Sequence, residues 1–144
     1  MVEFNRLRAD SELAHFGQEL FEKALQLGGR GNEYNVERKR NLAWANQELS
    51  SGLEDVDVLL GCTYEPAWVS NLGGGDNFGR ASWITTLPAV AGTPIGTIPM
   101  GLVDGMPVGL GFVVGRNQEQ VLINAMAQAE RALGLGVLRP TFTR

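Results

Sequence analysis

Two side chains of this sequence could together form a nucleophile and its base. Cys62 is the single cysteine and His15 the single histidine. A reactive thiolate needs a base or a positive charge beside it, so a Cys62–His15 dyad is one interpretation. We favour the other, in which Cys62 is a buried or half-buried thiol and His15 a partly buried residue of a helix. A lone cysteine also excludes an internal disulfide.

The sequence carries no pattern typical of a metal-binding or nucleotide-binding site. One cysteine, one histidine and scattered carboxylates lack the ligand spacing of a metal site, so we expect neither a metal nor another cofactor. The three glycines at 73–75 resemble a phosphate-binding loop but lack its Lys-Ser/Thr pair. The run 37–40 (ERKR) is basic, but 12 basic against 16 acidic residues give a net charge of -4. This balance argues against a nucleic-acid partner.

Length and hydropathy limit the classes of protein to which this chain can belong. The chain has 144 residues, of which 44% are hydrophobic, enough for one domain with its own core. No apolar stretch reaches the roughly 20 residues of a membrane helix, and the first 15 residues lack the apolar stretch of a secretory signal. We therefore expect a single cytoplasmic domain, 1–144, without membrane contact.

The first third of the chain predicts two helices. Residues 10–27 have helical periodicity, with Asp10 or Ser11 as the cap and Gly28-Gly29 as the stop. Residues 33–53 form the second predicted helix, opened by Asn32. Apolar residues at helical spacing define the predicted buried stripe of each helix: Leu13, Phe16, Leu20, Ala24 and Leu27 in the first, and Leu42, Ala45, Leu49 and Leu53 in the second.

The remaining two thirds predict strands and further helices. We expect a strand at 56–60, a loop over 61–80, a short helix over 81–91 broken at Pro88, and a hairpin of 95–100 and 108–114 around Asp104-Gly105. The apolar strands 56–60 and 108–114 predict cover on both faces. Asn117 with Gln120 resembles a capping box that opens a helix to about Leu133, with a buried face of Val121, Leu122, Ala125, Met126, Ala129 and Leu133 that ends at Gly134. The predicted class is α/β, a small mixed sheet of about three strands, including a hairpin, covered by about four helices.

The segment 89–115 (AVAGTPIGTIPMGLVDGMPVGLGFVVG) carries a recognisable motif. Its Ala-Gly-x-Pro turn, a strand with Pro-x-Gly, and Met-Pro-Val-Gly-Leu resemble the C-terminal signature of the amidase signature family. FNRLRADSELAHFGQELFEKALQLGG, DVDVLLGCTYEPAW and NFGRASWITTLPAVAG resemble family segments in the same order. The resemblance covers nearly the whole chain but only the C-terminal third of such an enzyme. It implies a fragment of the amidase signature fold and, for the family, hydrolysis of linear amides without a cofactor.

The resemblance does not extend to the family's catalytic region. That region holds a Ser-cisSer-Lys triad, upstream of the matched part, and no motif of this chain replaces it. Lys23 and Lys39 lie on predicted amphipathic helices, and Ser50-Ser51 lies late in one. The resemblance implies no catalytic residue here, and places four residues along a substrate cleft: Trp68, Phe78, Arg80 and Trp83. The planar guanidinium of Arg80 suits a carboxylate or carbonyl; alternatively, Trp68 and Trp83 only cover the sheet.

Two functions are open at this point. We expect a truncated, non-catalytic, stand-alone protein that forms homo-oligomers or binds a small amide or carboxylate. The alternative is the C-terminal component of a split amidase whose triad comes from another chain. In either case a sheet that lost its neighbouring strands exposes an edge, so we expect a homodimer or a complementary chain as partner.

Overall fold

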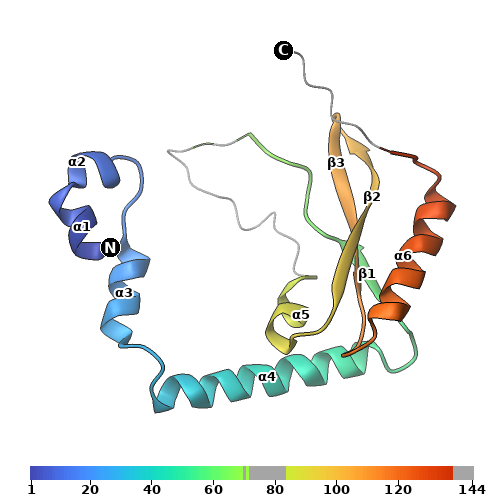
Figure 1. The fold of residues 1–144 in the computed structure, drawn as a ribbon, viewed down its shortest axis with the longest axis horizontal. Helices are drawn as coiled ribbons and strands as arrows, with labels where there is room; N and C mark the ends of the chain where they lie inside the picture. Colours follow the sequence, from blue (N-terminus) through green and yellow to red (C-terminus); the bar gives the residue numbers. More distant parts are fainter. Residues whose placement is uncertain (70, 72–83, 138–144) are drawn as a thin grey trace. The chain divides into compact units, whose positions relative to one another are not determined.

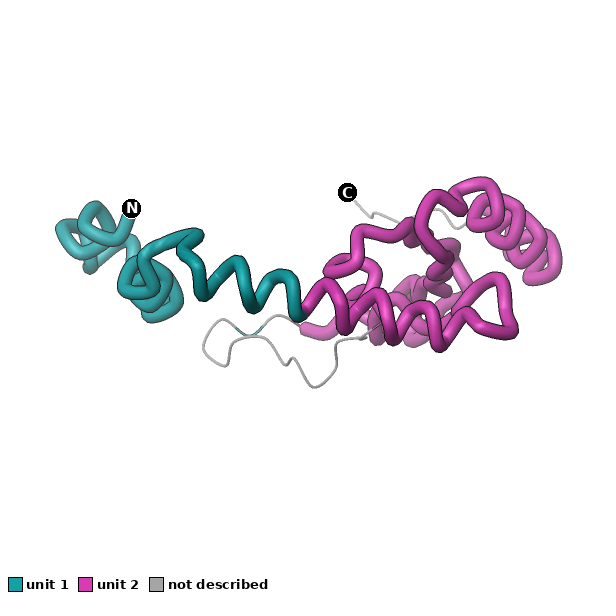
Figure 2. The backbone as a smooth tube through the Cα atoms, turned by 90° about the horizontal axis from the view of Figure 1, so that it is seen from below, with its two compact units in different colours: residues 1–40, 70–76 teal, residues 41–69, 77–144 magenta. Residues whose placement is uncertain are grey.

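The computed structural model describes residues 1–69, 71 and 84–137. The chain forms two compact units, shown in different colours in Figure 2: unit 1 comprises residues 1–40 and 70–76, and unit 2 comprises 41–69 and 77–144.

Unit 1 contains three short helices, α1 (Val2–Leu7), α2 (Ala9–Glu12) and α3 (Glu19–Leu27). The predicted helix 10–27 is therefore wrong as one element, because residues 13–18 are not helical. Gln18 explains the interruption: its side chain is buried and donates a hydrogen bond from Nε2 to the carbonyl of Val2 at 3.3 Å. Arg6 and Glu22 add an ion pair at 2.8 Å. These contacts hold the start of α3 against α1.

The predicted boundaries of this helix have mixed outcomes. Asp10 and Ser11 lie inside α2, whose N-cap is Arg8, so their predicted capping role is wrong. Gly28 ends α3 in the left-handed conformation (φ 72°), which confirms the predicted stop. The predicted buried stripe is wrong, since Phe16, Leu20, Ala24 and Leu27 are exposed and Leu13 is half-buried.

Helix α4 (Asn32–Gly52) confirms the second predicted helix. Residues up to 40 belong to unit 1 and those from 41 onward to unit 2. Ala45 and Leu49 of the predicted stripe are buried, and Leu42 and Leu53 are half-buried. Only the second half of α4 thus contributes to a core.

Unit 2 is built on a three-stranded sheet of β1 (Leu59–Cys62), β2 (Ile95–Val103) and β3 (Met106–Val113), in the order β1-β3-β2. Both pairings are antiparallel, so the predicted mixed sheet is antiparallel throughout the described residues. The α/β class and the three strands are confirmed, with six helices in the described chain where about four were expected. Asp104 (φ 51°) and Gly105 (φ 78°) form the tight turn of the predicted hairpin.

The two strands that were expected to be covered on both faces differ in their burial. β3 is central, and its adjacent residues Phe112 and Val113 are both buried, which confirms that prediction. The strand expected at 56–60 begins only at Leu59 and extends to Cys62. Its side chains alternate between half-buried and exposed, so the expected cover on both faces is wrong for β1.

Two further helices complete unit 2. Helix α5 (Thr86–Ala91) contains Pro88 in its first turn, where a missing N–H is tolerated, so the expected break there is wrong. Helix α6 (Glu119–Leu133) confirms the last predicted helix and ends at Gly134 (φ 62°). The predicted capping box is wrong: Asn117 has a φ of 61°, and the Oε1 of Gln118 accepts a hydrogen bond from the N–H of Gly115 at 3.1 Å.

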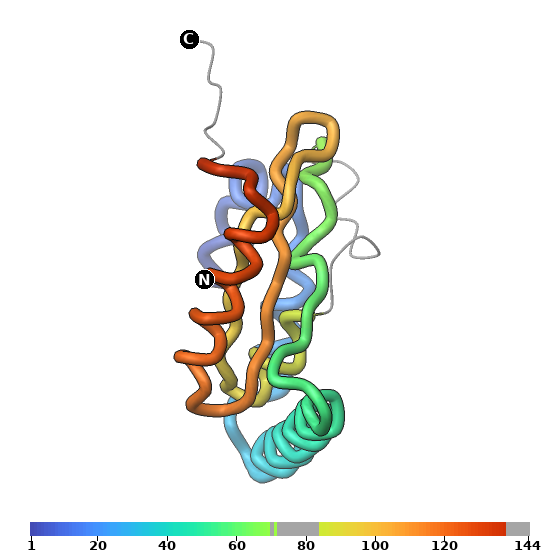
Figure 3. Tube along the Cα trace, turned by 90° about the vertical axis from the view of Figure 1, so that its right-hand side faces the viewer, coloured from blue at the N-terminus to red at the C-terminus, as the bar shows by residue number. Residues whose placement is uncertain are grey.

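Helices α5 and α6 lie on opposite faces of the sheet (Figures 1 and 3), and each face carries a hydrophobic cluster. On one face, α4 and α5 pack with Ala45, Leu49 and Ala91 against Val113. On the other, α6 packs with Leu122 against Ile98, Phe112 and Val114. Val121, Ala125, Met126 and Ala129 adjoin this second cluster, whereas Leu133 of the predicted face is exposed.

Candidate functional site

Two threonines meet across the central strand on the α5 face of the sheet. Their hydroxyl oxygens, Oγ1 of Thr63 and Oγ1 of Thr97, lie 2.8 Å apart and share a hydrogen bond. Thr63 directly follows β1 and donates its backbone N–H to the carbonyl of Gly109 at 2.8 Å. Thr97 lies on β2 opposite Gly111. The register of three strands therefore fixes the positions of both hydroxyls.

Glycine on β3 makes this meeting possible. A Cβ added to Gly109 would lie 2.6 Å from Oγ1 of Thr97 and 3.0 Å from Oγ1 of Thr63. A Cβ added to Gly111 would lie 3.2 Å from Oγ1 of Thr63. Any side chain at Gly109 would thus force the two hydroxyls to shift. The two threonine side chains therefore lie over a part of β3 where glycines leave only backbone beneath them.

One apolar side chain lies beside the threonine pair, and two exposed aromatic residues follow Thr63 in the chain. Ile84 lies over the neighbouring glycines, because a Cβ on Gly61 would be 2.9 Å from its Cδ1 and a Cβ on Gly111 3.5 Å from it. The segment after β1 carries Tyr64 and Trp68, both exposed, with 41% of Trp68 accessible. The hydroxyl pair is itself exposed, so a molecule lying on this face could reach it.

The two hydroxyls have hydrogen-bonding capacity beyond the bond that they share. A hydroxyl donates one hydrogen bond and accepts two, so a pair that shares one bond still offers one O–H donor and further acceptor positions. An amide group presents the matching C=O and N–H. Within the described part of the chain, each hydroxyl bonds to the other and not to an acid or a base, which an activated nucleophile would need. The hydroxyl pair could donate a hydrogen bond to such a C=O and accept one from such an N–H.

The residues proposed from the sequence have different outcomes. Trp68 lies in the segment that follows β1, while Phe78, Arg80 and Trp83 lie outside the described residues. Cys62 is exposed at the end of β1, so the expected burial of its thiol is wrong. His15 is exposed between α2 and α3, which also corrects its predicted place on a helix. The two belong to different units.

The threonine pair was not predicted from the sequence. Its two members are 34 residues apart, and neither lies in a motif of catalytic type. The available signal was the alternation Gly109-x-Gly111 within an apolar strand, since glycine in a strand often marks a close approach. Which side chains approach depends on the register, which the sequence alone does not give.

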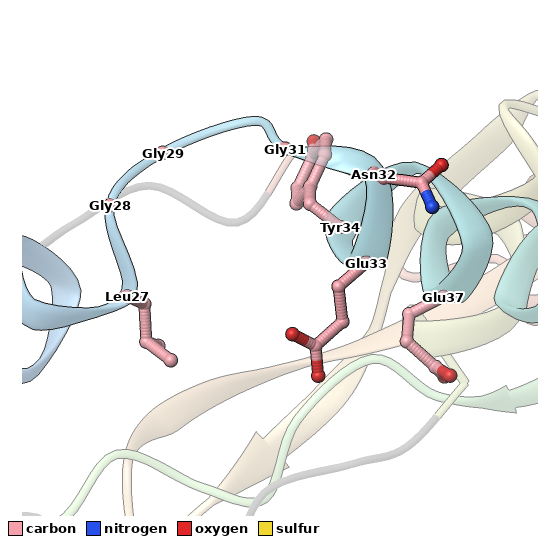
Figure 4. Close-up of a pocket in the computed structure, with 8 residues that line it drawn as sticks. All are labelled: Leu27, Gly28, Gly29, Gly31, Asn32, Glu33, Tyr34 and Glu37. Atoms are coloured by element: carbon pink, nitrogen blue, oxygen red, sulfur yellow. The ribbon is translucent and has the colours of Figure 1, made fainter.

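Two surface hollows lie elsewhere. In unit 1, a pocket of about 420 Å³ lies where α3 passes into α4; Figure 4 shows the carboxylates of Glu33 and Glu37 beside it, with Tyr34 and Leu27. In unit 2, a groove of about 470 Å³ lies between β1 and α6. Among the described residues no group of three or more acids, histidines or cysteines could hold a metal ion. Over the same residues, no helix is long and apolar enough to cross a membrane.

Comparison with known proteins gives close matches over part of longer chains. One subunit of the glutamyl-tRNA(Gln) amidotransferase of Halobacterium salinarum is 29% identical over 89% of this chain and 32% of its own. A peptide amidase, solved with the competitive inhibitor chymostatin, is 32% identical with a TM-score of 0.85 over 99% of this chain and 29% of its own. A bacterial aryl acylamidase of the amidase signature enzymes shares the fold, at 20% identity and a TM-score of 0.63, over 95% of this chain and 33% of its own. No family model matches.

These matches cover almost all of the present chain, which spans about a third of the length of its relatives. They confirm the resemblance first seen in the segments 4–29, 55–68 and 89–115. In these relatives, the region that matches the three-stranded sheet and its helices is one part of a longer chain. By sequence and by fold, the chain belongs to the amidase signature family.

Proposed function

We propose that this chain is one component of a carboxamide hydrolase and works together with a complementary amidase segment. The segment would be the part of the amidase fold that this chain does not match, about two thirds of it, on a second polypeptide or on the same one. It would supply the nucleophile and base. Residues 1–144 would act as one domain that completes the substrate cleft.

The exposed apolar face of α3 carries this proposal. Leu20, Phe21, Leu25 and Leu27 are 52–81% exposed on a helix of nine residues. Burial of one such side chain stabilises a structure by about 1.5–3 kcal/mol, so a helix that leaves four of them in water has a strong drive to find cover. Clustered exposed apolar residues of this kind mark interfaces.

The threonine pair gives the chain a role in the cleft. Thr63 and Thr97 would hydrogen-bond the carboxamide of the substrate, and the complementary segment would attack its carbonyl carbon. Trp68, Phe78, Arg80 and Trp83 stay our proposed cleft-lining residues, with Arg80 directed to a carboxylate or carbonyl of the substrate. No residue of this chain is proposed as nucleophile.

A chimera tests this function. Residues 1–144 would replace the matching segment of the peptide amidase, and release of ammonia from a peptide amide would be measured. We expect turnover by the chimera, and none by the isolated chain or by the amidase without its segment. Thr97→Val should raise KM more than it lowers kcat, whereas Thr86→Val, at the start of α5, should change neither. A folded chimera that releases no ammonia would contradict the proposal.

The stand-alone oligomer remains the competing function, because β1 and β2 are the outer strands of the described sheet, and outer strands are where another chain can pair. In that case the isolated chain would form a stable dimer by light scattering and bind a small amide or carboxylate without hydrolysing it. A monomer whose aggregation increases with concentration would instead favour the missing segment. Location in the cytoplasm is part of either proposal.

A further inference from the structure

Helix α6 covers only part of its face of the sheet. It packs over β2, where Gly96 approaches Met126 without room for a side chain. Leu60 of β1 lies opposite Phe112 on the same face, yet Leu60 is 60% exposed whereas Phe112 is buried. The groove of about 470 Å³ lies here, between β1 and α6, which flank β3 in Figure 3. Exposed apolar surface beside a hollow is typical of a binding surface.

Small residues of α6 form one long wall of this groove. Val121, Ala125 and Ala129 are spaced four residues apart, so they lie in one row along the helix. Alanine has a short side chain, so this row leaves space for larger apolar side chains of another segment. Asn124 and Gln128 also line the groove and are exposed, and they can hydrogen-bond the backbone of such a segment.

One end of the groove is acidic. Leu59 pairs with Val113, so the residues just before Leu59 lie at the end of the sheet where α6 begins. Three carboxylates stand there, those of Glu54, Asp55 and Asp57, and Asp57 lines the groove. The ion pairs among the described residues include none of the three. A segment with a basic residue at this end would be attracted, and an acidic segment repelled.

The sequence after α6 has the complementary composition. Residues 138–144, which lie outside the described part of the chain, read LRPTFTR and carry two arginines and no acid. In an extended segment, alternate side chains point to opposite sides, and a proline disfavours helix at the residue before it. Apolar residues alternate here with polar ones: Leu138, Pro140 and Phe142 with Arg139, Thr141 and Thr143. An extended segment would thus present one apolar side, followed by the charge of Arg144.

The link between α6 and this segment permits a reversal of direction. α6 ends at Leu133, and Gly134 and Gly136 both have positive φ, at 62° and 65°. Glycine adopts such angles at no steric cost, which is why it is common where a chain turns back.

The length of the segment matches the groove. Five extended residues, from 137 to 142, can span about 17 Å. Along α6, the distance from Leu133 back to Ala125 is about 12 Å, and back to Val121 about 18 Å. Phe142 would therefore lie between the levels of Ala125 and Val121, and Arg144 beyond them, at the acidic end.

We propose that residues 138–144 bind back along the groove of their own chain. Phe142 would fill the space beside Leu60 and Phe112, and Arg144 would pair with the carboxylates before β1. Because the link to α6 is short, the segment is held near the groove at a high effective concentration. The inference does not rest on the proposed function, since the groove lies on the face of the sheet opposite the threonine pair.

NMR contacts within the chain of 144 residues test this inference. We expect nuclear Overhauser contacts from the ring of Phe142 to the methyl groups of Leu60 and Ala125, and none to Val90 on α5. The amides of residues 141–143 should have order parameters above about 0.6, the upper bound for flexible backbone. A Phe142 ring without contacts to the groove would overturn the inference.

A matched pair of substitutions shows whether the groove holds the segment. Leu60 and Ile123 are 60% and 59% exposed, but only Leu60 lines the groove. Leu60→Ser should remove the contacts between Phe142 and Ala125 and lower the order parameters of 141–143 below about 0.6. Ile123→Ser should leave both unchanged, and equal effects of the two substitutions would overturn the inference.

A change in the segment itself gives a second measurement if Leu60→Ser does not fold. Phe142→Ser should move the methyl resonances of Leu60 and Ala125 and leave that of Val90 in place. Unchanged resonances at Leu60 and Ala125 would refute the binding.

A mixture of isotope-labelled and unlabelled chains identifies the origin of the bound segment. We expect the contacts of Phe142 only within one chain. Contacts between a labelled and an unlabelled chain would overturn the inference, because the segment of a second copy would then be the occupant.

Discussion

Adjacent residues on α6 test whether this helix packs on the sheet as described. Leu122 is 7% exposed within the cluster of Ile98, Phe112 and Val114, while Ile123 is 59% exposed. Leu122→Ala removes three buried carbon atoms, worth about 2.4 kcal/mol at about 0.8 kcal/mol each. The remaining cavity adds to this cost, so we expect a loss of about 3 kcal/mol in the free energy of unfolding, inside the range of about 2–5 for such changes.

Ile123→Ala is the matched control on the same helix. It removes little buried surface and improves helix propensity slightly, so the free energy of unfolding should change by less than about 0.5 kcal/mol. Urea unfolding followed by circular dichroism measures both. With a slope of about 1–3 kcal/mol per molar urea, the midpoint of Leu122→Ala should fall by about 1–3 M. Equal losses for the two variants, or a loss below about 1 kcal/mol for Leu122→Ala, would refute this packing.

Three further substitutions test the hairpin turn between β2 and β3, the end of α5, and the glycine beneath the two threonines. Gly105→Ala places a side chain at a φ of 78° and should lower the free energy of unfolding, measured by thermal unfolding, by about 1–2 kcal/mol. Gly31→Ala is the control and should lower it little, because no atom lies within 4 Å of the added Cβ. Equal losses for the two variants would contradict the strained turn. Arg116→Met removes the 2.6 Å hydrogen bond from Nη2 to the carbonyl of Ala91 at the end of α5. It should lower the free energy of unfolding by about 1.5–3 kcal/mol in the same assay. Arg131→Met, on the exposed side of α6, is the control and should lower it less. Gly109→Ala should move the methyl resonances of Thr63 and Thr97 in NMR spectra and leave that of Thr86 in place; unchanged signals would show that the hydroxyls do not meet over this glycine.

Local signals predicted the elements whose ends are set by nearby residues. The hairpin follows from Asp104-Gly105, which accept positive φ. The ends of α3 and α6 follow from Gly28 and Gly134 for the same reason. None of these features needs information from distant parts of the chain.

Predictions that depended on tertiary contacts were less successful. The helical periodicity of 10–27 continues through residues that the structure uses as a turn, because the buried Gln18 bonds to Val2, sixteen positions earlier. The apolar run at 56–60 suggested a strand three residues too early. Gly61, a poor strand former, lies in the observed strand, beneath Ile84.

The candidate site shows the same division. The resemblance led to Trp68 and its predicted cleft partners through a sequence motif. The hydroxyl pair of Thr63 and Thr97 came only from the register, since three strands must align before the two side chains meet across Gly109.

The strand order has a consequence for how the chain folds while it is being synthesised. β2 and β3 pair across a two-residue turn, and α6 follows β3 directly, so these three can assemble as soon as they have left the ribosome. β1 pairs with β3 only through the closure of a long stretch, from Cys62 to Leu110, and each doubling of such a loop costs about 0.6 kcal/mol in chain entropy. The residues of β1 must therefore wait, apolar and unpaired, until nearly fifty further residues are made. We expect chaperones that bind nascent chains to contact this segment during that interval.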